Sequence, residues 1–131
     1  MKILTGKTSR AHANDAGIDL HCTSSHIIAP NDSAIISTGI TISLEPNTFA
    51  LVKSRSGLSF NYNLEVGAGV IDESYSGELR IHLYNHGQDA YKVSVGDKVA
   101  QLITLPVIYP IHKNDKEDTS RDTKGFGSSG V

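Results

Sequence analysis

Three segments of the chain combine residue types that bind phosphate groups. Residues 53–58 read Lys-Ser-Arg-Ser-Gly-Leu and join an expected strand to an expected short helix, whose free N–H groups and dipole favour an anion. Arg55 can grip a phosphate through its planar guanidinium, and Ser56 can donate from side chain and backbone. Residues 125–130 offer glycine N–H groups and two serine hydroxyls. The third segment, residues 96–101, is weaker, because Gly-Asp often marks only a turn.

The segment 67–78 places a carboxylate directly after a short apolar strand. It reads Gly-Ala-Gly-Val-Ile-Asp-Glu-Ser-Tyr-Ser-Gly-Glu. Its glycines allow a ligand to approach the backbone closely. Asp72 follows Val70 and Ile71, a position suited to a general base on a rigid support. Taken alone, Asp72 also fits a simple turn, residues 53–58 a capped turn with a surface arginine, and residues 125–130 a flexible terminus.

Taken together, these segments resemble the trimeric dUTPase family, whose five motifs occur here in order. They are residues 16–20, 55–58, 69–77 and 96–102, and finally Arg121 with 125–130. The resemblance spans roughly residues 15–131, and five motifs at family spacing are far more specific than any one alone. It implies hydrolysis of dUTP at the α-phosphorus to dUMP and pyrophosphate with Mg²⁺. That reaction limits uracil incorporation into DNA and supplies dUMP for thymidylate synthesis.

The resemblance also implies roles in catalysis and phosphate binding. Asp72 would accept a proton from the water that attacks the α-phosphorus. Tyr75 would lie against the deoxyribose and exclude a 2′-OH. Asp19 would orient the waters of a Mg²⁺ ion chelated by the triphosphate. The residues that would hold the α- and β-phosphates are Arg55, Ser56, Gly57 and Gln101.

The family resemblance implies that backbone groups and the C-terminal tail recognise uracil. The backbone around Ala68, Gly69 and Val70 would hydrogen-bond the uracil edge in a β-hairpin. In the tail, Arg121 would act in catalysis by pairing with the γ-phosphate, and Phe126 would stack on uracil. The tail residues expected beside the substrate also include Gly127, Ser128 and Ser129.

None of the departures from the family pattern removes a residue assigned to chemistry. Ser54 stands where the family usually has Pro, and Lys98 stands where it usually has Arg. The remaining departures are Ser74 for Asp, Ser76 for Arg, Asp122 for Gly and Ser129 for Thr. Ser76 and Asp122 bear on subunit contacts or tail docking, so they concern affinity more than activity.

The elements that must position these residues are predicted to be short strands. Residues 79–84 alternate with a period of two, so that Leu79, Ile81 and Leu83 share one face. A helix of one or two turns is expected at 56–61. The predicted strands are 18–22, 27–28, 34–44, 48–53, 79–84, 90–95 and 98–107. Many short strands between turn signals predict an all-β, single-domain, jelly-roll-like β-barrel.

The chain is expected to divide into a β domain, residues 1–111, and a flexible tail, residues 112–131. Residues 112–124 contain no apolar side chain and cannot offset their ordering entropy by burial. With 131 residues, no Trp and only 6% aromatics, the chain is suited to burying surface by oligomerising. The family resemblance specifies a homotrimer with active sites between subunits.

Composition excludes several other classes of protein. The net charge of −2 argues against direct nucleic-acid binding. The single cysteine excludes an intrachain disulfide and fits a reducing compartment. No apolar run approaches the roughly 20 residues that span a bilayer, and the N-terminus lacks the apolar stretch of a signal peptide. We therefore expect no membrane contact and a cytoplasmic or otherwise intracellular location.

Particular residues distinguish two alternative functions from dUTP hydrolysis. A non-catalytic dUTPase-like nucleotide-binding regulatory protein should have lost Asp72, Arg121 or Phe126, and all three are present. A dCTP deaminase, which resembles dUTPase in fold, would need a glutamate where this chain has His82. The histidines at 21, 26, 82 and 86 match no closed zinc pattern.

Overall fold

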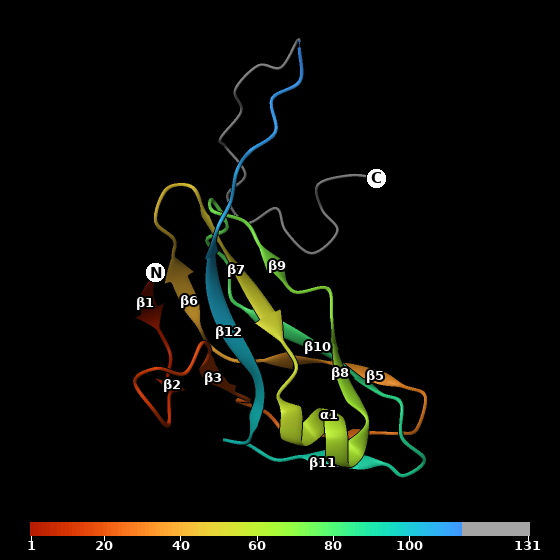
Figure 1. The fold of residues 1–131 in the computed structure, drawn as a ribbon. Helices are drawn as coiled ribbons and strands as arrows, with labels where there is room; N and C mark the ends of the chain where they lie inside the picture. Colours follow the sequence, from red (N-terminus) through yellow and green to blue (C-terminus); the bar gives the residue numbers. More distant parts are fainter. Residues whose placement is uncertain (114–131) are drawn as a thin grey trace.

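The computed structural model describes residues 1–113 as an antiparallel β structure with one short helix (Figure 1). The elements are β1 (Lys2–Thr5), β2 (Thr8–Ser9), β3 (Ile18–His21), β4 (His26–Ile28), β5 (Ser33–Ser37), β6 (Thr41–Ser43), β7 (Thr48–Lys53), α1 (Ser56–Tyr62), β8 (Leu64–Gly67), β9 (Val70–Ile71), β10 (Arg80–Asn85), β11 (Tyr91–Val93) and β12 (Lys98–Pro106). The all-β, jelly-roll-like fold predicted from the sequence is confirmed. None of the described helices could span a membrane.

Two sheets provide most of the framework. The larger has five strands in the order β2-β3-β12-β7-β9, and the smaller has three in the order β5-β10-β8. Two further antiparallel pairs, β1 with β6 and β4 with β11, complete the described strands. Neighbours in a sheet are mostly distant in sequence, so segments far apart along the chain meet on adjacent strands.

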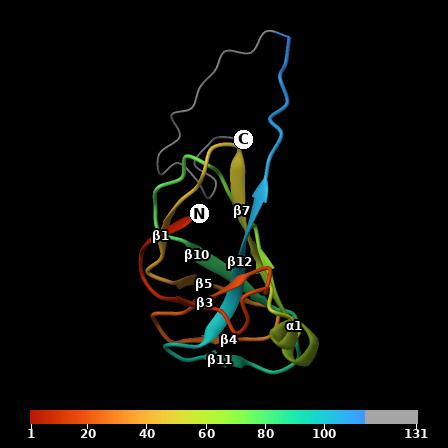
Figure 2. The same cartoon turned by 60° about the vertical axis from the view of Figure 1, so that its left-hand side comes forward.

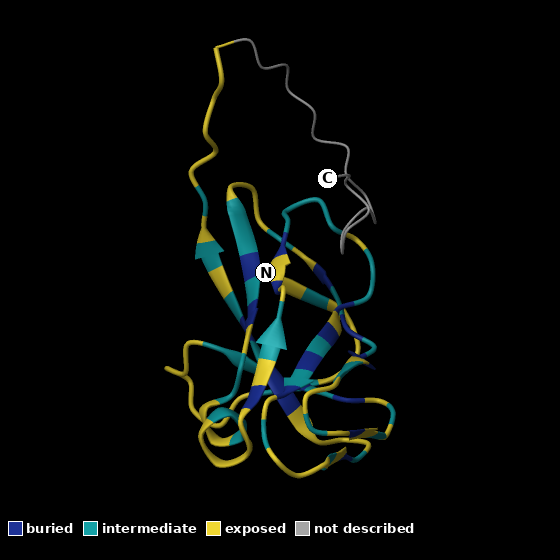
Figure 3. Ribbon diagram, turned by 90° about the vertical axis from the view of Figure 1, so that its right-hand side faces the viewer, coloured by how far each residue is buried: buried dark blue, intermediate teal, exposed yellow. Residues whose placement is uncertain are grey.

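Alternating burial forms the core between the sheets. On β10, Ile81 and Leu83 are buried, with Leu79 just before the strand, as the period of two predicted. From the larger sheet, Val52 on β7 and Leu102 on β12 are buried in the same cluster. Figure 3 shows this alternation of buried and less buried residues along the strands. Each such side chain contributes about 1.5–3 kcal/mol of hydrophobic stabilisation.

One predicted strand is wrong as a single element. Residues 34–44 form two strands, β5 and β6, because Gly39 has a φ of +70° and breaks the extended backbone. Side chains stabilise this break. The Thr38 hydroxyl donates to the Leu79 carbonyl at 2.6 Å, and the Gly39 N–H donates to the Glu78 carboxylate at 3.0 Å.

Three short strands, β1, β2 and β8, were not predicted. In β8, Leu64 and Val66 alternate with Glu65, a signal that its short length obscures. The predicted helix is present and ends one residue later than expected, at Tyr62. The Asn63 that follows adopts the left-handed conformation that commonly terminates a helix.

The two ends of β7 lead to different parts of the molecule. Its C-terminal end continues into α1, while its first residue, Thr48, pairs with Pro106, the last residue of β12. Beyond β12, residues 107–113 run out from the body in both Figure 1 and Figure 2. Ile108 is 95% exposed and Ile111 is 90% exposed, so this segment adds nothing to the core of its own chain.

Candidate functional site

Three of the five sequence motifs converge on one polar pocket of about 250 Å³. The loop before β3 and β3 itself provide one wall, the start of α1 provides another, and β12 completes it. The lining residues are Asp15, Ala16, Gly17, Asp19, Arg55, Ser56, Gly57 and Gln101. The structure therefore brings together the carboxylate predicted for the metal and all four side chains or glycines predicted for the phosphates.

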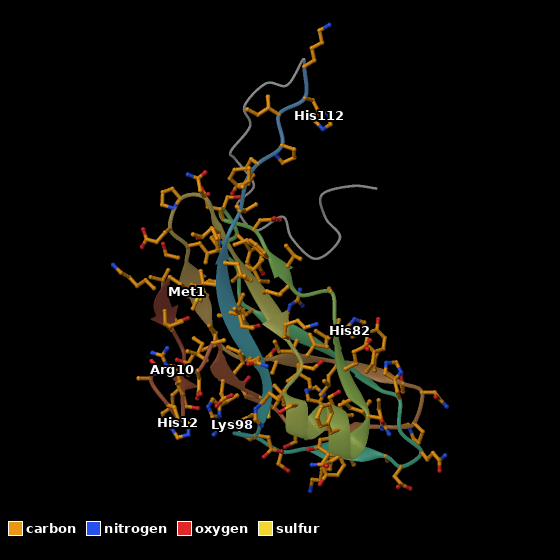
Figure 4. The ribbon with its side chains drawn as sticks, in the orientation of Figure 1. Met1, Arg10, His12, His82, Lys98 and His112 are labelled. Carbon is orange, nitrogen blue, oxygen red and sulfur yellow. The ribbon has the colours of Figure 1, made fainter. Side chains whose placement is uncertain are left out.

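Arg55 is oriented in this pocket by the carboxylate of Asp19. The Arg55 Nε lies 3.3 Å from Asp19 Oδ1, and the Lys98 Nζ lies 3.6 Å from Oδ2. The Asp19 side chain is 18% exposed and that of Arg55 is 34% exposed. Because Arg55 meets Asp19 through Nε, its two terminal amino groups remain available as a fork for an anion. Lys98 is the first residue of β12 and is labelled in Figure 4.

The side chain of Gln101 is held between Ser54 and Gly17. Its side-chain Nε2 donates to the Ser54 carbonyl at 2.9 Å. Its Oε1 lies against Gly17, where an added Cβ would meet that oxygen at 2.6 Å. Only glycine therefore fits at position 17 without displacing Gln101, which explains why a glycine precedes the strand that carries Asp19.

The first residues of α1 line the pocket. Arg55 is its N-cap with extended backbone, at φ −83° and ψ 136°, and no side chain caps the first N–H groups. The leading N–H groups of any helix have no intrahelical partner. Here they belong to Ser56 and Gly57, which line the pocket, so the segment can present both backbone donors and the Arg55 guanidinium to an anion.

The turn at residues 67–69 is not the β-hairpin that was expected. Among the described strands, β8 pairs with β10 and β9 pairs with β7, so the turn links two different sheets. Ala68 has a φ of +51° and Gly69 a φ of +112°. The Gly69 carbonyl accepts a hydrogen bond from the Val52 N–H at 2.8 Å. Ala68 is exposed and Gly69 is buried. The turn therefore has backbone groups at the surface at Ala68, although it is not a hairpin.

Asp72 and Tyr75 lie in a tight turn after β9. The Tyr75 N–H donates to the Asp72 carbonyl at 3.0 Å, and the Tyr75 hydroxyl donates to the Glu78 carbonyl at 2.7 Å. Gly77 is required here because a Cβ would collide with that hydroxyl. Burial raises the pKa of Tyr75, an effect that Arg80 opposes and Glu78 reinforces. Tyr75 therefore stays a neutral, fixed ring at neutral pH.

Strand register separates Asp72 from the pocket. Ile71 pairs with Ala50 on β7, whereas Gln101 pairs with Lys53 at the other end of that strand. With about 3.3 Å per residue along a strand and about 4.8 Å between strands, the Cα atoms of Asp72 and Gln101 are on the order of 16 Å apart. Within one chain, the predicted base and the predicted phosphate-binding residues therefore form two separate clusters.

A metal cage built only from protein side chains is not found in residues 1–113, where no three His, Cys, Asp or Glu groups gather suitably. Mg²⁺ commonly uses one or two carboxylates together with substrate phosphates and waters. Asp19 and Asp15, both on the pocket wall, fit an ion that phosphate oxygens hold and that the chain contacts through water.

The predicted residues Arg121, Phe126, Gly127, Ser128 and Ser129 lie outside the described residues. Val70 is described and is 62% exposed at the start of β9.

Sequence reasoning assigned no role to four residues that the structure places in or near the site. Asp15 and Gly17 line the pocket, and Lys98 binds Asp19. Asp15 stands directly before the recognised motif 16–20 and Gly17 stands within it, so their proximity to Asp19 was the available signal. Glu73 was also missed. Its Oε1 accepts hydrogen bonds from the Asn47 N–H at 2.6 Å and from the Tyr109 hydroxyl at 3.0 Å. These bonds tie the turn after β9 to the segment after β12.

Comparison with known proteins identifies the family. A family model described as dUTPase matches residues 7–130 of this chain. The chain belongs to the dUTPase family. It is 39% identical over 125 residues to the deoxyuridine 5′-triphosphate nucleotidohydrolase of Swinepox virus, covering 94% of this chain and 88% of that protein. It is 42% identical over 125 residues to the Clostridium acetobutylicum enzyme of the same name, covering 92% and 86%.

Solved dUTPase structures share the fold. A variant dUTPase from phage phi11 of S. aureus superimposes with a TM-score of 0.77 at 27% identity, covering 88% of this chain and 93% of that one. That structure concerns the coordination of a structural Mg(II) ion. The dUTPase of Staphylococcus bacteriophage 80alpha with dUpNHpp gives a TM-score of 0.77 at 28% identity, covering 95% and 92%. The EIAV dUTPase gives 0.76 at 30% identity, covering 91% and 97%.

The turn at 67–69 provides a direct test of the described geometry. In a Gly69→Ala variant the new Cβ would meet the Val52 carbonyl oxygen at 2.5 Å, at a φ that L-residues rarely adopt. We expect the free energy of unfolding to fall by at least about 2 kcal/mol. Gly57→Ala is the matched control, because nothing lies within 4 Å of its Cβ position, and it should change stability by less than about 1 kcal/mol. Equal urea midpoints for the two variants would contradict the geometry.

Proposed function

We propose that this chain hydrolyses dUTP to dUMP and pyrophosphate, using Asp72 as general base and the pocket at Arg55 for the phosphates. The activity follows from the dUTPase family and from relatives named as dUTP nucleotidohydrolases. The observation that supports the residue assignment is the pocket itself, where three motifs far apart in sequence meet. Deamination of dCTP is not favoured, since His82 binds the Ser33 hydroxyl on the outer face of β10 and carries no carboxylate.

The phosphate-binding residues act by position and charge. Phosphate hydrolysis needs alignment and charge neutralisation more than covalent chemistry. Arg55, held through Nε by Asp19, directs its terminal amino groups to the phosphates. The backbone N–H groups of Ser56 and Gly57 donate beside it, and Gln101 completes the contact. These donors stabilise the negative charge that develops as the bond to the leaving pyrophosphate breaks.

Asp72 removes the proton from the attacking water. Base assistance of this kind accelerates hydrolysis about 10²–10⁴-fold, so the remaining acceleration comes from the phosphate contacts. Mg²⁺, when chelated by the triphosphate, would neutralise charge there, with Asp19 contacting its waters. Asp19 would then serve two partners, the metal's waters and the Arg55 guanidinium.

Base and sugar selection belong to the turn at 67–69 and to Tyr75. Backbone donors and acceptors of Ala68, Gly69 and Val70 would pair with uracil and leave buried groups unsatisfied with cytosine, a mismatch that can cost about 10⁴-fold. The Tyr75 ring, fixed by its bond to the Glu78 carbonyl, would pack on the deoxyribose and exclude a 2′-OH. We expect dUTP to be present inside cells, and we therefore expect this chain to act at an intracellular location.

We further propose a homotrimer whose sites form between subunits. The support is the separation of Asp72 from Gln101, on the order of 16 Å within one chain. General-base catalysis needs the carboxylate within hydrogen-bond reach of the attacking water, and this separation leaves Asp72 outside the pocket that Gln101 lines in the same chain. Two copies can satisfy this, one providing Asp72 and the other Arg55. The exposed Ile108 and Ile111 also leave apolar surface for a neighbouring subunit to cover.

The tail, residues 112–131, is proposed to close over the site. Arg121 would pair with the γ-phosphate and Phe126 would stack on uracil, with Gly127, Ser128 and Ser129 nearby. From Tyr109 to Phe126 there are 17 residues, which reach at most roughly 55–60 Å. That length is sufficient to reach a neighbour's site and hold these groups at high effective concentration.

The reaction is tested by pyrophosphate release from dUTP by the wild type and by Asp72→Asn. The Asn variant keeps the shape but removes the base, so kcat should fall about 10²-fold or more. In ¹⁸O-water, the wild type should place label in dUMP because attack occurs at the α-phosphorus. Glu45→Gln, an exposed carboxylate before β7, is the matched control and should keep wild-type kcat. Label only in pyrophosphate, a fully active Asn variant, or equal kcat/KM for dUTP and dCTP would contradict the proposal.

The tail is tested by truncation after Asp118, which removes Arg121 and Phe126. Because Phe126 and Val131 are the only large apolar residues lost, we expect thermal stability and the number of subunits in the assembly to stay unchanged. Activity should fall by orders of magnitude, since closure and γ-phosphate contacts are lost. Wild-type kcat/KM in the truncated protein would show that the tail has no catalytic part.

A further inference from the structure

Ser54 connects the phosphate pocket to the turn at 67–69. It lies between β7 and α1, directly before Arg55. Its backbone carbonyl accepts from Gln101 Nε2 at 2.9 Å. Its side-chain Oγ accepts from the Val66 N–H on β8 at 3.0 Å. One residue therefore contacts both the pocket wall on β12 and the strand that enters the turn.

The Val66 N–H is a group that needs a partner from outside its own sheet. Among the described strands, β8 is the edge strand of the order β5-β10-β8. Its outer row of N–H groups faces away from β10, and Val66 is partly buried there. A partly buried N–H without an acceptor costs about 1–3 kcal/mol. The Ser54 hydroxyl provides that acceptor from the neighbouring segment, which a residue without a side-chain oxygen would not do.

The other side of the turn is held by the same segment. Val52, two residues before Ser54, donates its N–H to the Gly69 carbonyl at 2.8 Å. The turn between these two bonds contains Ala68 at a φ of +51°, a conformation that persists only when its surroundings enforce it. Residues 52–54 thus hold the turn at its entrance and at its exit, and the entrance bond depends on one hydroxyl.

We propose that Ser54 is a positioning residue for base recognition, fixing the turn at 67–69 relative to Arg55 through its hydroxyl. This inference rests on the proposed function, in which the backbone of Ala68 and Gly69 recognises uracil. Loss of the hydroxyl loosens the turn and weakens nucleotide binding and selection. The chemical step is spared, because Asp72 lies at the far end of β9, beyond the strand pairing with β7.

The experiment compares Ser54→Ala, which removes the acceptor, with Ser54→Thr, which keeps it. For Ser54→Ala we expect KM for dUTP and Kd for dUpNHpp to rise about 3- to 10-fold, the range that one ordinary hydrogen bond accounts for. We expect kcat to stay within about 2-fold. The dUTP over dCTP ratio in kcat/KM should fall, and hydrogen exchange of the Val66 amide should accelerate. Ser54→Thr should stay near wild type in all five measurements. Ser43→Ala, an exposed serine on β6, controls for the substitution itself.

The outcomes separate this inference from the proposed function. Faster Val66 exchange with unchanged KM and Kd would overturn it, since the hydroxyl would then be structural only. Equal losses in the Ala and Thr variants would also overturn it, because the hydroxyl would not matter. A wild type that fails to hydrolyse dUTP would refute the proposed function. In that event the dUpNHpp affinities and the Val66 exchange rates, which need no turnover, still decide the role of Ser54.

Discussion

The antiparallel pairing of β9 with β7 determines how the functional groups are distributed. It places Ile71 opposite Ala50, so Asp72 emerges near the start of β7, while the end of β7 leads to Ser54 and Arg55. A shift of this register by one residue would also turn Ile71 out of the core. Core packing therefore fixes the position of Asp72, the proposed base, far from the Arg55 pocket of the same chain. The homotrimer proposed above would bring the two clusters together from different copies.

Charge inside the pocket is balanced locally. Asp19 forms ion pairs with Arg55 through one oxygen and with Lys98 through the other, on a wall that also contains Asp15. The chain as a whole carries a net charge of −2, so the proposed binding of a triphosphate would depend on these few cations and on helix N–H groups rather than on a basic surface. This arrangement suits a small polyanion better than a nucleic acid.

The sequence predicts much of the fold and names five residues that the structure brings together in one pocket, Asp19, Arg55, Ser56, Gly57 and Gln101. The period of two in β10 identifies Ile81 and Leu83 as core, and the Arg55 motif marks the start of α1. Tertiary effects set the rest. The break at Gly39 depends on Glu78, almost forty residues later, and the turn at 67–69 links two sheets because of long-range pairing. Gln101 and Gly17 meet only once β12 and β3 are neighbours.

The claim that each site takes Asp72 and Arg55 from different copies is tested most directly by mixing two inactive variants, Asp72→Asn and Arg55→Ala. The chains are unfolded together and reassembled, with mass spectrometry used to establish that mixed oligomers form. If the two residues come from different subunits, a random equal mixture should recover roughly a quarter of wild-type activity, because that fraction of sites pairs two intact residues. Mixed oligomers that remain as inactive as either variant alone would contradict the account.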